Sequence, residues 1–395
     1  MALSTPEVCT ASPAKQRRKL TQNDDDHNQQ PLLPGLPDHI AQACLSLVHP
    51  SILYSVCRSW RRVIYTRSFP PFPSLYALLS SSSSSSLQNS IQFYNFDPIS
   101  SSWRALPTTP PDPPLHLFLR HPSFISRNLP IQTVSASGKL VLLAATTHNF
   151  FPALPRPLVF DPDTSRWLFG PPLANPRRWC AAGTLSGAVY VASGIRSHFS
   201  IDIARSVEKW VLSKKNDNSS PIPIGRNPTR NEHMGWEWER VSGLRDGRFS
   251  RDAIDAVGWR GKLCMVNVKG DAVKDGLVYD AEKDAWQDMP EGMIAGWTGP
   301  VAAMDEDVMY VVDEAKGALR RYDPARDMWD QILESESLRG ADQIAAGGGR
   351  VCVVCRGRIV VVDVAASGPR LWHVEAPSGL EAVAIHILPR MSQPV

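Results

Sequence analysis

One short pattern recurs along the chain with constant internal spacing: an aromatic residue, then Asp, then Trp six residues after the Asp. It occurs as Phe96-Asp97…Trp103, Phe160-Asp161…Trp167, Tyr279-Asp280…Trp286 and Tyr322-Asp323…Trp329. Four matches exceed what chance predicts for a chain of 395 residues, so the pattern indicates a structural repeat. Two weaker copies run from Glu208 to Trp238 and from Asp363 to Trp372.

Each copy of the repeat suits a β-strand, a tight turn and a second strand. Apolar residues before the Asp predict the first strand. The Asp carboxylate accepts hydrogen bonds from nearby backbone N–H groups in the turn, and the Trp ring fills space between neighbouring sheets. Because the Asp recurs at one place in the repeat, a turn-forming role is favoured over a ring of catalytic carboxylates. The Trp set is likewise interpreted as core rather than as a sugar-binding platform.

Hairpins with an apolar–Gly–apolar pattern lie upstream of several Asp positions, which makes about four strands per repeat. They cover residues 134–141, 184–191, 256–263 and 345–354. Six such units predict a mainly β fold, a six-bladed β-propeller. We expect a last apolar strand, residues 382–388, to pair with strands within residues 72–106 and so close the ring without open edges. The longer intervals between repeats require insertion loops, for which residues 116–128 and 214–230 are suited.

The first 31 residues have a different composition. Residues 15–19 are a basic cluster, three consecutive Asp residues follow at 24–26, and few apolar residues are present. Such a segment cannot bury enough apolar area to offset its ordering entropy, so residues 1–31 are predicted to be a disordered tail. The cluster resembles a nuclear localisation signal, and a solvated tail is an equally suitable reading. Without a secretory signal pattern, we expect a nuclear and/or cytoplasmic protein whose seven Cys are reduced.

Residues 32–70 have a helical pattern. Ile40, Cys44 and Leu47 follow Asp38, a suitable N-cap, at spacings of three and four. Pro50 interrupts this stretch, and residues 52–64 form a second amphipathic one. A unit of about 40 residues is too small to be comfortably stable alone, so it should pack against a partner or against the rest of the chain.

These residues resemble a known combination of domains. The opening Leu36-Pro37-Asp38-x-Ile40 and the later Leu53-x-x-Val56-Cys57-Arg58-x-Trp60-Arg61-x-Val63-Ile64 look like an F-box, here residues 32–70. Residues 72–390 resemble a kelch-repeat propeller whose paired glycines are degraded, since only residues 347–349 are clearly glycine-rich. The chain is therefore similar to plant F-box/kelch-repeat proteins, and the fold expected is a six-bladed kelch-type β-propeller preceded by a small α-helical F-box.

The resemblance implies a non-catalytic role without cofactor or metal. In that family the F-box binds a Skp-type adaptor, which connects it to a cullin and a RING subunit, and the propeller holds a protein substrate for ubiquitination. Carried over to this chain, the adaptor-binding surface would consist of Leu36, Pro37, Ile40, Leu45, Leu53, Val56, Cys57, Trp60 and Ile64. The alternative is that these residues only pack the helical unit against the propeller.

Substrate recognition is expected in loops at one end of the ring, where Arg and aromatic residues precede several inner strands. The candidates are Arg177, Arg178, Trp179, Arg196, Arg248, Arg251, Trp297 and Gln343. Arg and Trp are favoured at interface hot spots, and an Arg-rich end suits an acidic or phosphorylated segment. For any one of these residues, an ordinary solvated loop position is the alternative.

Other chemistry has little support in the sequence. Cys352-x-x-Cys355 is the one CxxC pattern, and its thiols should point to opposite faces of a strand, which favours core thiols over zinc ligands. A net charge of +3 does not indicate a nucleic-acid partner, and no apolar run is long enough to predict a membrane span. Two other functions remain open: an adaptor-bound scaffold that does not promote degradation, and a propeller enzyme of galactose-oxidase or sialidase type. The enzyme would have no use for residues 36–64.

Overall fold

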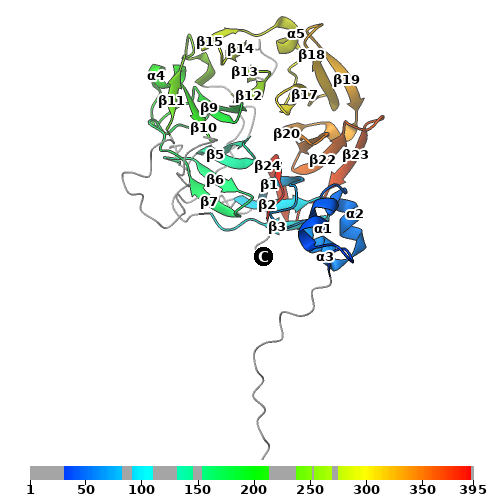
Figure 1. Cartoon of the computed structure of the whole chain (residues 1–395). Coiled ribbons are helices and arrows are strands. Elements are labelled where there is room, and N and C mark those ends of the chain that lie inside the picture. Colours follow the sequence, from blue (N-terminus) through cyan, green and yellow to red (C-terminus); the bar gives the residue numbers. More distant parts are fainter. Residues whose placement is uncertain are drawn as a thin grey trace, which may run out of the picture.

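A computed structural model describes residues 31–81, 91–109, 131–145, 154–212, 237–250, 253–268 and 275–392. Six antiparallel sheets of four strands each stand around a central axis, and three short helices lie beside the ring (Figure 1). The ring is a six-bladed β-propeller, as the repeat predicted. The two predicted insertion loops and the basic cluster at 15–19 lie outside the described residues.

The blades are numbered in chain order. The strands of each blade are given from the innermost to the outermost. Blade 1 holds β24 (Leu380–Pro389), β1 (Pro73–Ser81), β2 (Ile91–Asp97) and β3 (Ser102–Ala105). Blade 2 holds β4 (Ile131–Ala136), β5 (Lys139–Ala145), β6 (Leu158–Asp161) and β7 (Arg166–Phe169). Blade 3 holds β8 (Ala181–Leu185), β9 (Ala188–Ala192), β10 (Val207–Val211) and β11 (Glu239–Val241).

The remaining blades follow the same order. Blade 4 holds β12 (Ala253–Trp259), β13 (Lys262–Val268), β14 (Asp275–Asp280) and β15 (Ala285–Asp288). Blade 5 holds β16 (Val301–Met304), β17 (Val308–Asp313), β18 (Ala318–Asp323) and β19 (Met328–Glu334). Blade 6 holds β20 (Ala341–Gly347), β21 (Arg350–Cys355), β22 (Arg358–Asp363) and β23 (Arg370–Val374).

The last strand of the chain closes the ring. β24 pairs antiparallel with β1, from Pro73 opposite Pro389 to Ser81 opposite Leu380, and so supplies the inner strand of blade 1. The hydroxyl of Tyr76 also donates to the carbonyl oxygen of Pro389 at 2.8 Å. The closure predicted for residues 382–388 is therefore confirmed.

The repeated pattern has a simple structural cause. In each of the four clear copies the aromatic residue and the Trp are paired directly across the two outer strands, as Tyr279 and Trp286 are, with ring centroids 5.1 Å apart. The carboxylate of Asp280 accepts from the backbone N–H groups of Glu282 and Lys283, each at 3.1 Å. Asp97, Asp161, Asp323 and Asp363 accept backbone N–H groups in the same way. The turn-forming role of the Asp is confirmed.

The indole of the repeat Trp links neighbouring blades. In five blades its N–H donates to a carbonyl oxygen that follows the outer strand of the preceding blade. The bonds are Trp103 to Glu375 at 2.7 Å, Trp167 to Pro107 at 2.8 Å, Trp238 to Pro171 at 3.1 Å, Trp286 to Ser242 at 2.7 Å and Trp329 to Met293 at 3.0 Å. These residues are therefore structural, as the sequence predicted.

The two weaker copies depart from this arrangement. Trp372 is 38% exposed, faces the guanidinium of Arg350 at 5.8 Å, and makes no such bond within the described residues. Glu208 lies near the start of β10 rather than in a turn, and it pairs with Arg177. Treating Glu208 as the equivalent of the turn-forming Asp was therefore wrong, because β10 continues past Glu208 to Val211 and the turn comes only after that.

Six of the seven hydrophobic clusters lie between adjacent blades. Successive side chains of β21 serve two of them: Cys352 packs toward blade 1 and Cys355 toward blade 5. Burial raises the pKa of each thiol to about 12, so both are protonated near neutral pH. The interpretation of this CxxC as a pair of core thiols is confirmed.

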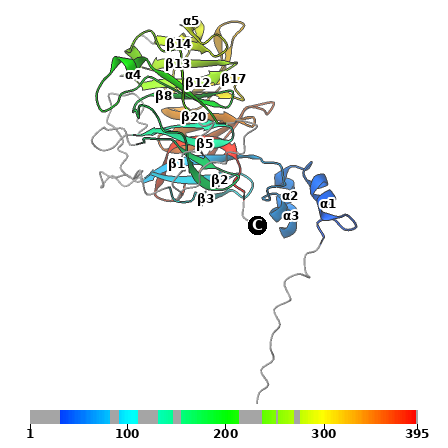
Figure 2. The ribbon, with the colours of Figure 1, turned by 60° about the vertical axis from the view of Figure 1, so that its left-hand side comes forward.

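The helices are short. α1 (Asp38–Leu45), α2 (Pro50–Val56) and α3 (Arg58–Val63) form a unit that projects from the ring near β1 and β2 (Figure 2). α4 (Ile201–Arg205) and α5 (Glu291–Ala295) belong to connections in the ring, as do the 3-10 turns at Arg248–Ser250 and Glu336–Leu338. Among the described residues, no helix is long and apolar enough to cross a membrane.

Candidate interaction surfaces of the helical unit and the ring

The helical unit has a small core of its own. Leu45, Leu53, Val63, Ile64 and Phe69 are buried together. Trp60 packs against this cluster, and its indole N–H donates to the carbonyl oxygen of Leu32 at 2.8 Å. A proline marks the start of both α1 and α2. Pro37 is the N-cap of α1, and Pro50 is the first residue of α2, a position where proline costs no helical hydrogen bond.

The nine residues predicted to bind an adaptor fall into those that belong to or pack against this core and those that reach the surface. Leu45, Leu53 and Ile64 are at most 3% exposed, so they cannot contact a partner directly, and their placement on the surface requires correction. They support the helices from beneath, and Trp60 is only half-buried beside them. The residues that do reach the surface are Leu36, Pro37, Ile40, Val56 and Cys57.

Five large apolar side chains of this unit are exposed, and we call them the apolar face. They are Leu36, Ile40, Leu47, Ile52 and Val56, with exposed fractions between 40% and 88%. Among the described residues only nine large hydrophobic side chains are exposed, so more than half lie within this short stretch. Complete burial of a fully exposed side chain of this kind is worth about 1.5–3 kcal/mol, so a partner that covered these partly exposed ones would gain a corresponding fraction for each.

Leu47 and Ile52 are additions to the predicted surface. Leu47 is 88% exposed and lies in the turn after α1, next to the Pro50 break. Turn residues are usually solvated, so an apolar residue at such a position is the signal that identifies it from sequence. Ile52 needed the structure, because its helical spacing fits a core position as well as a surface one.

The helical unit is joined to the ring by specific polar contacts. The hydroxyl of Tyr65 donates to the carboxylate of Asp97, the repeat Asp of blade 1. Arg390, which follows the closing strand and is 3% exposed, donates to the carbonyl oxygens of Thr66 at 2.5 Å and Phe69 at 3.1 Å. Burial, and then the hydrogen bond to Asp97, raises the pKa of the Tyr65 hydroxyl well above its usual value. We call these contacts of Tyr65 and Arg390 the joint, and no motif in the sequence indicated them.

The joint defines two ends of the ring. Pro73, Pro389 and the turn after Asp97 lie at the end that carries the helical unit, here called the helical end. The first hairpin turn of neighbouring blades lies there too, since a Cβ on Gly138 would be 3.3 Å from Pro389 and one on Gly348 would be 2.9 Å from Pro73. Because the strands alternate in direction, the β9–β10 connection and the loops before β8 and β12 lie at the opposite end, the far end.

Three of the residues predicted to bind substrate are structural instead. Arg177 is 1% exposed and donates to Ser193 O, Ser206 Oγ and Glu208 Oε1. Trp297 is fully buried in the cluster between blades 4 and 5. The side-chain amide of Gln343 is bonded in both directions to the backbone of Ile385, at 3.1 Å and 2.8 Å, which links two inner strands.

Four of the other predicted residues lie at the far end. Arg178 and Ile195 form a β-bridge, which brings the loop before β8, with Trp179, against the β9–β10 connection, with Arg196. Arg248 is exposed and forms ion pairs with Asp246 at 2.9 Å and Asp275 at 3.1 Å. Arg251 lies outside the described residues. In the described part of the chain, no group of three His, Cys, Asp or Glu side chains is arranged to hold a metal ion.

Known proteins are similar to this chain in sequence over most of its length. The chain is 52% identical over 391 residues to an F-box/kelch-repeat protein of Arabidopsis thaliana, SKIP25, which covers 97% of this chain and 94% of that protein. It is 24% identical over 342 residues to the F-box protein AFR of the same plant, covering 83% of this chain and 82% of that protein. No family model matches the chain. A helical F-box joined to a six-bladed propeller, with this degree of identity over nearly the whole length, shows that the chain belongs to the F-box/kelch-repeat family.

Proposed function

We propose that the chain is the substrate-recognition subunit of an SCF-type ubiquitin ligase. The helical unit would bind a Skp-type adaptor, and through it a cullin and a RING subunit, while the propeller would hold a protein substrate. The observation that carries this proposal is the apolar face, because its five exposed side chains lie on a unit too small to bury them.

The joint at Arg390 supports a positional mechanism. A receptor of this kind performs no chemistry itself, and it raises the effective concentration of substrate lysines near the conjugating enzyme. That gain depends on a defined distance between adaptor and substrate. Tyr65 of the helical unit donates to Asp97 of blade 1, and Arg390, which follows the closing strand, donates to Thr66 and Phe69; these contacts would hold the unit in one position on the ring.

Adaptor binding tests the first half of the proposal. Purified chain and a Skp-type adaptor are compared in a pull-down with an Ile40→Glu, Val56→Glu double variant, which places two charges in the apolar face. Binding should weaken at least tenfold. The matched control is Ile201→Glu, Met328→Glu, which changes two apolar residues of similar exposure on the ring and should leave binding unchanged. Equal binding by both variants and the intact chain would contradict the proposal.

Ubiquitin transfer tests the second half. The chain is assembled with adaptor, cullin and RING subunit, and ubiquitination of captured proteins is measured with the intact chain and with the Ile40→Glu, Val56→Glu variant. Transfer that requires the apolar face supports a degradative receptor. Adaptor binding without transfer to any captured protein would instead favour the non-degradative scaffold.

A further inference from the structure

We propose that a surface of blade 3 at the far end binds an acidic segment of the substrate that carries an apolar anchor residue. This blade-3 patch consists of Arg178, Trp179, Arg196, Phe199, Ile201 and Arg245. The inference rests on the proposed receptor function and assigns its substrate site and the chemistry of the segment bound there.

The patch stands on a rigid foundation. The buried guanidinium of Arg177 donates to Ser193 O at 3.1 Å, to Ser206 Oγ at 2.8 Å and to Glu208 Oε1 at 2.5 Å. These partners lie at both ends of the β9–β10 connection and in β10, while Arg177 itself belongs to the loop before β8. A buried, charge-assisted network of this kind holds its members in one arrangement. Residues 178–179 and 194–205 are therefore presented in a defined geometry.

Trp179 has an unusual backbone conformation. Its φ of 54° lies in the left-handed region, which a bulky side chain rarely adopts. Such strain persists only where the surroundings impose it, and it is concentrated at functional sites. Here the bridge between Arg178 and Ile195 imposes it, and the guanidinium of Arg178 lies 4.1 Å from the centroid of the Trp179 ring. The result is a stacked, half-buried Arg–Trp pair at the edge of the two loops, and these residue types are favoured at interface hot spots.

An apolar pair lies on the connection that this bridge holds in place. Phe199 and Ile201 are 48% and 49% exposed. They lie over the loop that follows β11, since a Cβ on Gly247 would be 2.9 Å from Ile201 Cδ1 and 3.8 Å from Phe199 Cζ. Two large, half-exposed apolar side chains bridging two loops form a surface on which a single Leu, Met or Phe of a partner can be buried.

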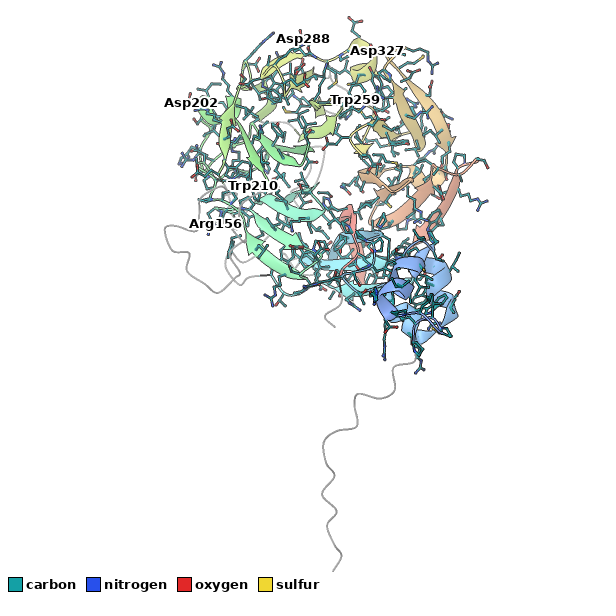
Figure 3. The ribbon with its side chains drawn as sticks, viewed as in Figure 1. Arg156, Asp202, Trp210, Trp259, Asp288 and Asp327 are labelled. Atoms are coloured by element: carbon teal, nitrogen blue, oxygen red, sulfur yellow. The ribbon has the colours of Figure 1, made fainter. Side chains whose placement is uncertain are left out.

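The charges around the apolar pair are mainly positive. Arg196 and Arg245 are exposed and form no ion pair within the described residues. Arg248 pairs with both Asp246 and Asp275, so this group of three keeps one negative charge, and the exposed Arg205 at the end of α4 adds a positive one. Asp202, on the outer rim of the ring in α4 (Figure 3), is the one carboxylate of this helix. Positive rim charges with an apolar centre complement an acidic segment that has one apolar side chain, and they disfavour a basic one.

The helical end has one acidic hairpin. Its hairpin between β16 and β17 carries Asp305, Glu306 and Asp307 in sequence. Glu306 accepts the Ser186 N–H at 2.8 Å, and Asp307 pairs with Arg260 at 2.7 Å. An acidic segment is thus repelled from this hairpin and attracted to the far end, away from the surface that binds the adaptor.

The test uses the purified full-length chain and a fluorescently labelled twelve-residue peptide that contains four Asp or Glu and one central Leu. Three further peptides accompany it: one with Asn and Gln in place of the acids, one with Ser in place of Leu, and one with phosphoserine in place of two acids. Anisotropy should show binding of the acidic peptide, and at least tenfold weaker binding of the first two. Comparable or tighter binding of the phosphorylated peptide identifies phosphate as an accepted source of the charge.

Variants locate the site. Arg196→Glu, Arg245→Glu and, separately, Phe199→Ser, Ile201→Ser should each weaken the acidic peptide at least tenfold while thermal unfolding stays unchanged. Arg104→Glu, Arg166→Glu makes the same change in net charge at exposed positions of blades 1 and 2 and should have little effect. Absence of binding to the intact chain, or equal losses in all three variants, would overturn the inference. So would tighter binding of a twelve-nucleotide single strand that is lost in the same variants.

The adaptor pull-down keeps this result separate from the proposed function. Both blade-3 variants should bind the Skp-type adaptor as the intact chain does. Loss of peptide binding alone concerns the substrate site, whereas loss of adaptor binding by the Ile40→Glu, Val56→Glu variant concerns the receptor function. If the intact chain binds the adaptor but none of the acidic peptides, the receptor function stands and the blade-3 assignment is wrong.

Discussion

The guanidinium of Arg390 donates to the carbonyl oxygen of Thr66 at 2.5 Å, although 324 residues separate them in the chain. One end of this contact follows the strand that closes the propeller, and the other follows the last helix of the F-box. The contact that orients the F-box therefore depends on closure of the ring. An opened propeller would lose both substrate geometry and F-box position.

Arg390→Met should loosen this joint without affecting the apolar face. The substitution leaves the carbonyl oxygens of Thr66 and Phe69 without their charged donor, which should lower the unfolding free energy by about 2–3 kcal/mol. Hydrogen exchange should become faster at residues 65–72, and adaptor affinity should stay within twofold. Arg166→Met, at an exposed Arg of blade 2, is the control. Unchanged exchange at residues 65–72 would show that the joint does not hold the F-box.

The hydrogen bonds that indole N–H groups make between blades predict that substitution of two tryptophans lowers the unfolding free energy by different amounts. Trp286→Phe removes a donor to the carbonyl oxygen of Ser242 and should cost about 1–2 kcal/mol of unfolding free energy. Trp372→Phe should cost less than about 0.5 kcal/mol, because Trp372 is partly exposed and makes no such bond within the described residues. Urea denaturation of the two variants measures the difference. Equal costs would argue against the interblade role of the indole N–H.

His386 should make stability depend on pH. Its two ring nitrogens are bonded to the hydroxyls of Thr133 at 2.8 Å and Ser135 at 2.9 Å, and burial lowers its pKa from 6.5 to about 4. The unfolded chain therefore binds a proton more readily than the folded one. Stability from this group is fully present above pH 6.5 and is lost progressively as the pH falls toward 4, by about 3 kcal/mol in all.

The variant His386→Gln isolates this contribution, because Gln can keep one of the two hydrogen bonds and does not titrate. Unfolding free energies of the intact chain and the variant are measured between pH 4 and pH 8. Their difference should shrink as the pH falls through this range, since only the intact chain must protonate a buried imidazole. A difference that stays constant with pH would contradict the pKa shift of His386.

The buried pair of Arg177 and Glu208 should be strongly coupled. Glu208→Ala leaves a buried guanidinium without its carboxylate, at a cost of about 3–5 kcal/mol, and Arg177→Met should cost a similar amount. The double variant should lose clearly less than the sum of the two, because it buries no unpaired charge. Chemical denaturation of the intact chain, the two single variants and the double variant measures the coupling between the two side chains. Additive losses would mean that the two side chains stabilise the loops independently.

Some of the candidate site was accessible to sequence reasoning. The F-box pattern located the helical unit, and exposed Leu36, Pro37 and Ile40 agree with its opening motif. Periodicity could not separate Leu53, which is buried, from Ile52, which is 56% exposed, because both suit an amphipathic helix and the choice depends on which side meets α3. The loop position of Arg177 likewise suggested a surface residue, because the sequence does not show that Glu208 lies beside it.

The amino-acid sequence determined by itself the blade and four of its six copies, since each aromatic–Asp–Trp hairpin forms from residues close together in the chain. Alternation of apolar residues likewise sufficed to assign the final strand to ring closure. Tertiary structure alone decided which apolar side chains of the F-box remain exposed, which arginines are buried, and how Arg390 holds the two parts together. Those outcomes depend on contacts between residues far apart in the chain, and such contacts leave no local periodicity to read.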